Sequence, residues 1–162
     1  MPDHINAHLH EEAATLALGT ALAHAIVPGM TIYLHGDLGA GKTALTRAML
    51  HALGHGGRVK SPTYTLAEPY TITTAAGVLQ VVHFDLYRMS GPEEFLDAGF
   101  REHFNAEIVC IIEWPEKADG VLPNPDLRIS LSVAGQGRDV ELLALSDQGI
   151  ACLNRLKFAP NL

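Results

Sequence analysis

The sequence is poor in cysteine, in aromatic residues and in long apolar runs. It has two cysteines among 162 residues, Cys110 and Cys152, and neither lies in a C-x-x-C pair or at metal-ligand spacing. This excludes a disulfide framework and a cysteine-based zinc site. We expect both to be buried thiols in a reducing compartment. The most apolar stretch, residues 16–27, is interrupted by glycine, threonine and histidine and is too short to span a bilayer.

Positive charge is also scarce. The chain has 11 Lys and Arg against 18 Asp and Glu, a net charge of -7, so its overall field repels phosphate backbones and disfavours autonomous nucleic-acid binding. Residues 1–4 lack the basic region of a signal peptide. We therefore expect a cytoplasmic protein without membrane association. The length suits a single domain over residues 1–162.

The dominant motif is an octapeptide that fits G-x-x-x-x-G-K-[ST], namely Gly36-Asp37-Leu38-Gly39-Ala40-Gly41-Lys42-Thr43. Backbone N–H groups cradle a phosphate chain only if glycines let the loop approach it closely. The helix that follows would present the positive end of its dipole to the anion. Lys42 would reach the outer phosphates, and the Thr43 hydroxyl would be a Mg²⁺ ligand.

The sequence around this loop predicts alternating strands and helices. Residues 30–35 are β-branched and aromatic, as in a strand, and residues 43–53 repeat apolar side chains at helical spacing. An amphipathic helix is expected over residues 11–26, ended by Pro28-Gly29. The loop thus lies at a strand-to-helix junction, where the motif has its phosphate-binding geometry.

The rest of the chain predicts further strands and two helices. Residues 107–112 form a continuous apolar run, as in a strand buried on both faces. Residues 58–66 and 79–87 are expected to pair antiparallel through a turn at 71–77, and residues 128–133 and 138–145 through Gly135-Gln136-Gly137. Ser90, with Glu93, resembles a capping box that begins a short helix, and Ser146 is expected to cap a last helix ending near Leu156.

Two acids follow apolar runs and compete for a role beside the phosphates. A carboxylate at the end of a neighbouring strand holds Mg²⁺ or positions a water. Glu113 ends residues 107–112, and Asp85 ends residues 81–84; the alternative for each is an ordinary solvated carboxylate. Thr63 and Thr65 are candidate hydroxyls that sense the terminal phosphate, with a solvated strand face as the alternative.

Two other patterns give little evidence for a function. His51 and His55 have i, i+4 spacing, but Gly54 breaks the helix between them and no third ligand lies at a diagnostic spacing. The tetrapeptide 116–119 resembles the guanine-recognition motif N-K-x-D but lacks its asparagine. Zinc binding and guanine specificity are therefore disfavoured. Trp114 and Pro115 directly follow Glu113 and are expected at the rim of the site or as a plain surface or core anchor.

Four motifs together resemble the TsaE (YjeE) family of bacterial P-loop ATPases, which are needed to make threonylcarbamoyladenosine in tRNA. They are the octapeptide, Lys60-Ser61-Pro62-Thr63-Tyr64-Thr65-Leu66, His83-Phe84-Asp85-Leu86-Tyr87-Arg88 and Ile112-Glu113-Trp114-Pro115-Glu116. The resemblance implies a P-loop NTPase-like α/β fold of three layers, with a mixed parallel and antiparallel sheet flanked by helices. It also implies ATP and Mg²⁺ binding, and slow hydrolysis that becomes useful within a complex with TsaB and TsaD.

The same resemblance implies roles for individual residues. Thr43, Asp85 and Glu113 would bind the metal, and the two acids would also serve hydrolysis. Residues 61–66, including Thr65, would act as a switch, and Trp114 would lie beside the nucleotide. Arg138, in the loop 136–138, would reach the nucleotide, and residues 11–15 would contact its base.

Two other functions remain open from the residues alone. A small-molecule kinase would need an acceptor pocket and usually an arginine-bearing lid, but the arginines here are scattered and no inserted lid is evident. A nucleotide-gated binding module with negligible turnover would leave Glu113 structural. The leading hypothesis is an accessory ATPase that reaches tRNA only indirectly, through its partner proteins.

The charge balance yields a first prediction. The isolated protein should bind tRNA poorly at physiological salt, because a net charge of -7 opposes the counterion release that drives such complexes. Filter binding or fluorescence anisotropy across a salt series measures this. A tight complex whose affinity falls steeply with salt, formed without partner proteins, would contradict the electrostatic argument.

Overall fold

The computed structural model describes residues 3–62 and 65–156 and is built on one seven-stranded sheet. The strands lie in the order β1-β7-β6-β2-β5-β4-β3. Pairing is parallel across β6, β2, β5 and β4 and antiparallel at both margins, which confirms the expected mixed sheet. The strands are β1 His4–Leu9, β2 Thr31–His35, β3 Ala67–Thr74, β4 Gly77–Asp85, β5 Ile108–Glu113, β6 Leu127–Ala134 and β7 Gly137–Ala144.

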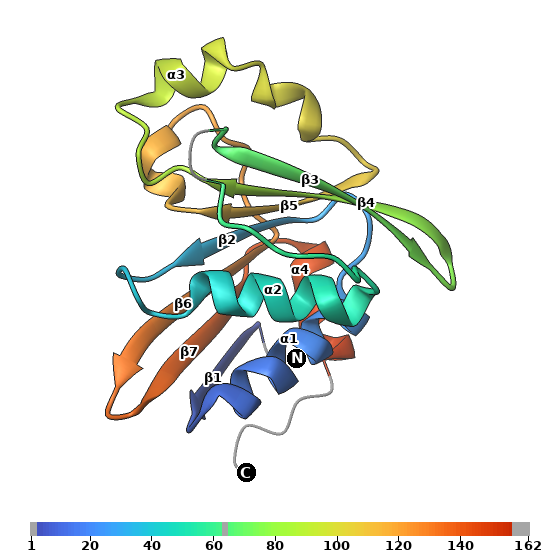
Figure 1. Ribbon diagram of the computed structural model, residues 1–162, viewed down its shortest axis with the longest axis vertical. Coiled ribbons are helices and arrows are strands. Elements are labelled where there is room, and N and C mark those ends of the chain that lie inside the picture. The colour runs from blue at the N-terminus through green and yellow to red at the C-terminus, as the bar shows by residue number, and fades with distance from the viewer. Residues whose placement is uncertain (1–2, 63–64, 157–162) are drawn as a thin grey trace.

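Helices flank this sheet, as Figure 1 shows. The helix α1 packs against α2 and also contacts α4, and these helices share one apolar cluster with the inner residues of β2, β6 and β7. A second cluster, with Phe84 and Phe95 at its centre, lies where α3, η1 and η2 meet β4 and β5. The helices are α1 Glu12–Ala25, α2 Lys42–Leu53, α3 Pro92–Asp97 and α4 Asp147–Arg155, with 3₁₀ turns η1 Phe100–His103 and η2 Pro115–Ala118.

The central strands bring distant motifs together. β5 is buried along nearly its whole length and pairs parallel with both β2 and β4, as its apolar sequence predicts. Parallel strands end at the same edge of a sheet, which is where such folds bind their ligands. Glu113 is in register with Asp85 of β4 and with Leu34 of β2, so both acids lie beside the loop that follows β2.

The partner predicted for β4 was wrong. β4 forms a hairpin with β3, Ala67–Thr74, and the turn is only the two residues between Thr74 and Gly77. The expected turn at 71–77 contains β-branched residues that alternate between buried and exposed, as a half-buried strand does. Of the predicted strand 58–66, the described residues 58–62, 65 and 66 are not in a strand; Thr63 and Tyr64 lie outside the described residues.

The N-terminal edge strand β1 was not predicted. Its sequence alternates His4, Asn6 and His8 with Ile5, Ala7 and Leu9, and it pairs antiparallel with β7. The two histidines made this segment too polar to be recognised as a strand. Both contact acids of β7: His4 lies 2.7 Å from Glu141 and His8 lies 2.7 Å from Asp139. The expected antiparallel pairing of residues 128–133 with 138–145 is confirmed by β6 and β7; the parallel pairing of β6 with β2 was not expected.

Helix boundaries mostly follow the predicted signals. α3 forms where expected, but its N-cap is Gly91, followed by Pro92 in the first turn. Ser90 instead donates a side-chain hydrogen bond to Glu94 at 3.1 Å, so the predicted cap was wrong. Ser146 does cap α4, since its Oγ accepts from Gly149 N at 3.0 Å.

The two thiols are buried, as expected, and neither is in a disulfide. Burial raises the pKa of Cys110 to about 12. Burial is also the largest cause of the raised pKa of Cys152, about 11. Both thiols therefore stay protonated at neutral pH. Across residues 3–62 and 65–156, no helix has the length and apolar character that crossing a membrane requires.

The α4 cap gives a stability prediction. The Ser146 hydroxyl accepts from Gly149 N and donates to Asp126 Oδ1 at 2.7 Å, while Asp126 Oδ2 accepts from Thr31 N of β2 at 2.8 Å. Ser146→Ala should lower the free energy of unfolding by about 1 kcal/mol, the usual loss for an N-cap. Chemical denaturation measures it. Ser132→Ala, at an exposed position on β6, is the control and should leave stability nearly unchanged; equal losses in both would refute the cap.

Candidate functional site

The glycine-rich segment between β2 and α2 has the conformation that the motif predicts. Gly36, Gly39 and Gly41 all have positive φ, at 153°, 82° and 103°, and only glycine adopts such angles without strain. Gly41 is the N-cap of α2. The loop therefore wraps the positive end of the α2 dipole, the geometry that binds phosphate in such loops.

Lys42 lies inside this loop and is 5% exposed. Its ammonium group donates to the carbonyl oxygen of Gly36 and, at 3.0 Å, to that of Asp37. The same Nζ lies 4.4 Å from the ring centroid of Trp114, a cation–π distance. The cation is thus held at the mouth of the loop, where an anionic ligand would meet it.

Arg138 of β7 binds the backbone of the glycine-rich loop. Its guanidinium donates to the carbonyl oxygens of Ala40 at 3.0 Å and Gly39 at 3.2 Å. These bonds hold the carbonyls toward β7. Because Arg138 binds these two carbonyl oxygens, they point away from the inside of the loop. This orientation leaves the N–H groups of the loop available to an anion.

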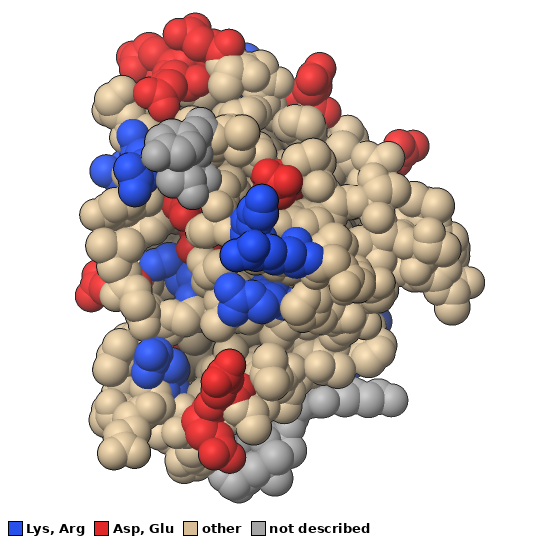
Figure 2. Space-filling model, in the orientation of Figure 1, with Lys and Arg blue, Asp and Glu red and all other residues tan. Residues whose placement is uncertain are grey.

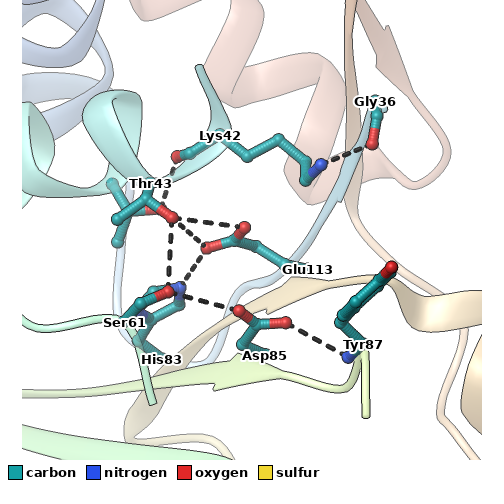
Figure 3. Close-up of polar contacts among 9 residues, drawn as sticks. Gly36, Lys42, Thr43, Ser61, His83, Asp85, Tyr87 and Glu113 are labelled. Carbon is teal, nitrogen blue, oxygen red and sulfur yellow. Dashed lines mark hydrogen bonds and ion pairs between the residues drawn. The ribbon is translucent and has the colours of Figure 1, made fainter. Parts of the chain in front are cut away.

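Thr43 and the two predicted acids meet in one polar network (Figure 3). The Thr43 hydroxyl donates to Glu113 Oε2 at 3.2 Å and lies 3.5 Å from Ser61 Oγ. Ser61 in turn donates to Asp85 Oδ2 at 3.2 Å. The structure therefore brings together the three oxygen-bearing side chains that the sequence proposed as metal ligands, and oxygen is the ligand that Mg²⁺ prefers.

The environments of the two acids differ. Glu113 is 2% exposed, and its Oε2 lies 2.6 Å from Nε2 of His83, which is fully buried. Asp85 is less enclosed; its Oδ1 accepts from Tyr87 N at 3.1 Å. Burial, with a smaller contribution from the charge of Glu113, raises the pKa of Asp85. Its carboxylate thus lacks part of the charge stabilisation that water would give.

Trp114 has the left-handed conformation, with φ of 60°, which is uncommon for a bulky residue. Besides contacting Lys42, its ring lies 4.9 Å from that of Tyr87. It is the single tryptophan of the chain. Trp114 forms a wall of the site, as the motif suggested.

Two cavities adjoin the loop. One, of about 290 Å³, holds the chemistry-bearing side chains: Lys42, Thr43, Ser61, Asp85, Tyr87, Glu113 and Trp114 line it, with Leu38, Gly39, Gly41 and Ala44. The other is also about 290 Å³ and includes Leu9, Glu11, Thr15, Gln136 and Arg138. Gly41 and Ala44 line both cavities, so the two open on either side of the same turn at the start of α2.

Not every predicted residue lines these cavities. Asp37 and Ala40 take part through their backbone carbonyls, as acceptors for Lys42 and Arg138. Thr65 is exposed and lines neither cavity. His51 and His55 contact the backbone carbonyls of residues 57 and 58, and no group of three potential metal-binding His, Cys, Asp or Glu residues occurs among the described positions.

Sequence reasoning missed His83 and the bonds of Ser61. The alternation of residues 81–85 places His83 on the same face as Asp85, a signal available from the strand period alone. Ser61 lies in a segment without regular secondary structure, and its contacts with Thr43 and Asp85 span 18 and 24 residues. Only the folded arrangement reveals them.

The charge distribution also favours an anionic ligand at this face. Figure 2 shows Lys and Arg side chains gathered over α2 and the segment that follows it. Arg47 of α2 and Arg58 and Lys60 of that segment are exposed. In a chain with net charge -7, this local reversal of sign raises the concentration of anions near the loop.

Comparisons with known proteins agree with these features. The family model described as "Threonylcarbamoyl adenosine biosynthesis protein TsaE" matches residues 9–140. The tRNA threonylcarbamoyladenosine biosynthesis protein TsaE of Haemophilus influenzae is 43% identical over 147 residues, 88% of this chain and 90% of that protein. The Bacillus subtilis protein of the same name is 36% identical over 135 residues, 83% and 82% of the two chains. The crystal structure of Bacillus subtilis YdiB is similar at a TM-score of 0.78, with 28% identity over 96% of this chain and 95% of that one. The chain therefore belongs to the TsaE family.

Proposed function

We propose that this protein is an ATPase that binds ATP and Mg²⁺ at the loop of residues 36–43 and hydrolyses ATP in support of tRNA threonylcarbamoyladenosine biosynthesis. The observation that carries the proposal is the single cavity that joins Lys42, Thr43, Asp85 and Glu113. It combines a buried cation for phosphate with three oxygen donors for a divalent metal. The named pathway of the relatives supports the biological role.

ATP would occupy both cavities. Its triphosphate would lie against the loop N–H groups and Lys42, and its nucleoside in the second cavity, between residues 9–15 and residues 136–138 at the start of β7. Because the cavities share Gly41 and Ala44, a ligand at the start of α2 can extend into each. This agrees with the expectation that residues 11–15 contact the base.

Magnesium fits the donor set beside the loop. Thr43, Glu113 and Asp85 would hold it or its waters, and the ion would supply charge neutralisation of the phosphates. The raised pKa of Asp85 fits this role, since a divalent cation restores the charge stabilisation that burial removes. Glu113 is the stronger candidate for activating a water, because its carboxylate is buried and accepts a hydrogen bond from Thr43.

The partners in this proposal are TsaB and TsaD, in the cytoplasm. TsaD would carry the transfer chemistry, and ATP hydrolysis here would support or reset their complex. tRNA would be reached only through that complex. The acidic net charge is consistent with an indirect contact.

Removing the Lys42 ammonium tests nucleotide binding. Lys42→Ala should weaken ATP binding by at least about tenfold, because it deletes a charge-assisted phosphate contact. Isothermal titration calorimetry gives the affinity. Arg101→Ala removes the same charge from an exposed position outside both cavities and should bind nearly as the wild type does; unchanged affinity in Lys42→Ala would overturn the phosphate-loop assignment.

Neutralising Glu113 tests hydrolysis. Glu113→Gln keeps the side-chain shape, so ATP binding should persist while turnover falls by roughly 10²- to 10⁴-fold, as expected for loss of a general base. A coupled ADP-release assay, with and without TsaB and TsaD, measures it. Glu107→Gln, an exposed acid just before β5, is the matched control. Wild-type turnover in Glu113→Gln would remove this residue from the mechanism.

A further inference from the structure

The buried contact between His83 and Glu113 has no part in the function proposed above. His83 Nε2 lies 2.6 Å from Glu113 Oε2, and the side chains are 0% and 3% exposed. Figure 3 shows the imidazole approaching the carboxylate from β4, while Thr43 approaches from α2. Glu113 is therefore held between two elements that the sequence separates widely.

The surroundings of the imidazole indicate where its proton lies. His83 Nδ1 is buried and has no hydrogen-bond partner among the described residues. A proton on Nδ1 would leave a buried donor unpaired, whereas a bare Nδ1 leaves only an unpaired acceptor, which is tolerated more readily. The Nε2 proton then points at Glu113, so the imidazole donates and the carboxylate accepts.

From this contact we propose that His83 is a positioning residue: its Nε2–H holds the Glu113 carboxylate in the orientation that faces Thr43. The inference rests on the proposed function, because it concerns how Glu113 is prepared for the metal or the water. A glutamate side chain has several rotatable bonds, and each contact that fixes it reduces the orientations available. Outer partners of this kind tune metal ligands in many proteins.

The packing explains why an apolar residue cannot replace His83 in this role. Val81 precedes it on the same face of β4 and belongs to the apolar cluster under α2, and Asp85 follows at the strand end. A leucine would fill the space at position 83 but would offer no donor. Glu113 would then keep only the Thr43 hydroxyl, at 3.2 Å and 3.5 Å from its two oxygens, and would lose its orientation.

The test compares His83→Leu, His83→Gln and the control Cys110→Ala in the full chain. Gln restores an N–H donor; Cys110 is buried on β5, and its thiol donates to His103 O rather than to Glu113. Turnover gives kcat and KM for ATP. Fluorescence of Trp114, the single tryptophan, follows ATP binding as Mg²⁺ is added. It gives the Mg²⁺ concentration at which the Mg²⁺-dependent part of ATP binding is half complete, and this measurement needs no hydrolysis.

His83→Leu should lower kcat, or raise the half-saturating Mg²⁺ concentration, by about 10- to 100-fold, as for other outer-shell partners, with KM for ATP nearly unchanged. His83→Gln should recover most of the loss, and Cys110→Ala should behave as the wild type. In a Glu113→Ala background, which removes the acceptor of His83 Nε2–H, His83→Leu should shift the Mg²⁺ dependence no further, since the two changes act through one contact.

Three results would overturn the positioning role while leaving the ATPase proposal intact. These are wild-type kcat and Mg²⁺ dependence in His83→Leu, equal defects in His83→Leu and His83→Gln, and full additivity with Glu113→Ala. A wild-type protein that neither binds nor hydrolyses ATP would instead overturn the proposed function, and the role of His83 with it.

Discussion

The parallel register of β2, β5 and β4 is the constraint on which the site depends. Glu113 is level with Asp85 on one neighbour and with Leu34 on the other, so two acids and the loop after β2 emerge at one edge. A shift of β5 by one residue would turn Glu113 to the opposite face of the sheet. The apolar residues of β5, buried between two parallel neighbours, fix that register through their packing and thereby align the chemistry.

The sequence was most informative where the signal is local. The glycine-rich loop, its flanking strand and helix, and the acids at the ends of β4 and β5 follow from short patterns, and all lie where they were predicted. β3 and β1 were missed because threonine in one and histidine in the other made half-buried edge strands resemble polar loops. Edge strands carry only half of the apolar pattern that identifies a central strand.

The contacts that tune the site were not predictable in the same way. Arg138 bonds to loop carbonyls 98 and 99 residues away, and His83 meets an acid 30 residues away. No local spacing encodes such pairs, because strand order decides them. Arg138 was expected to reach the nucleotide; its guanidinium is engaged with the loop backbone, so its influence on a ligand would act at least partly through the shape of the loop.

Two residues next to the site have a strained backbone conformation, and each makes a contact that positions or covers a charged group of the site. Leu66 and Trp114 are the non-glycine residues with positive φ in the described chain, at 64° and 60°, and such conformations persist only where surrounding contacts enforce them. The Leu66 carbonyl accepts from Asp85 N at 2.9 Å, and Trp114 covers Lys42. One strained residue therefore fixes the backbone of an acid, and the other shields the buried cation. The sheet aligns these groups, and the local strain determines how they face the cavity.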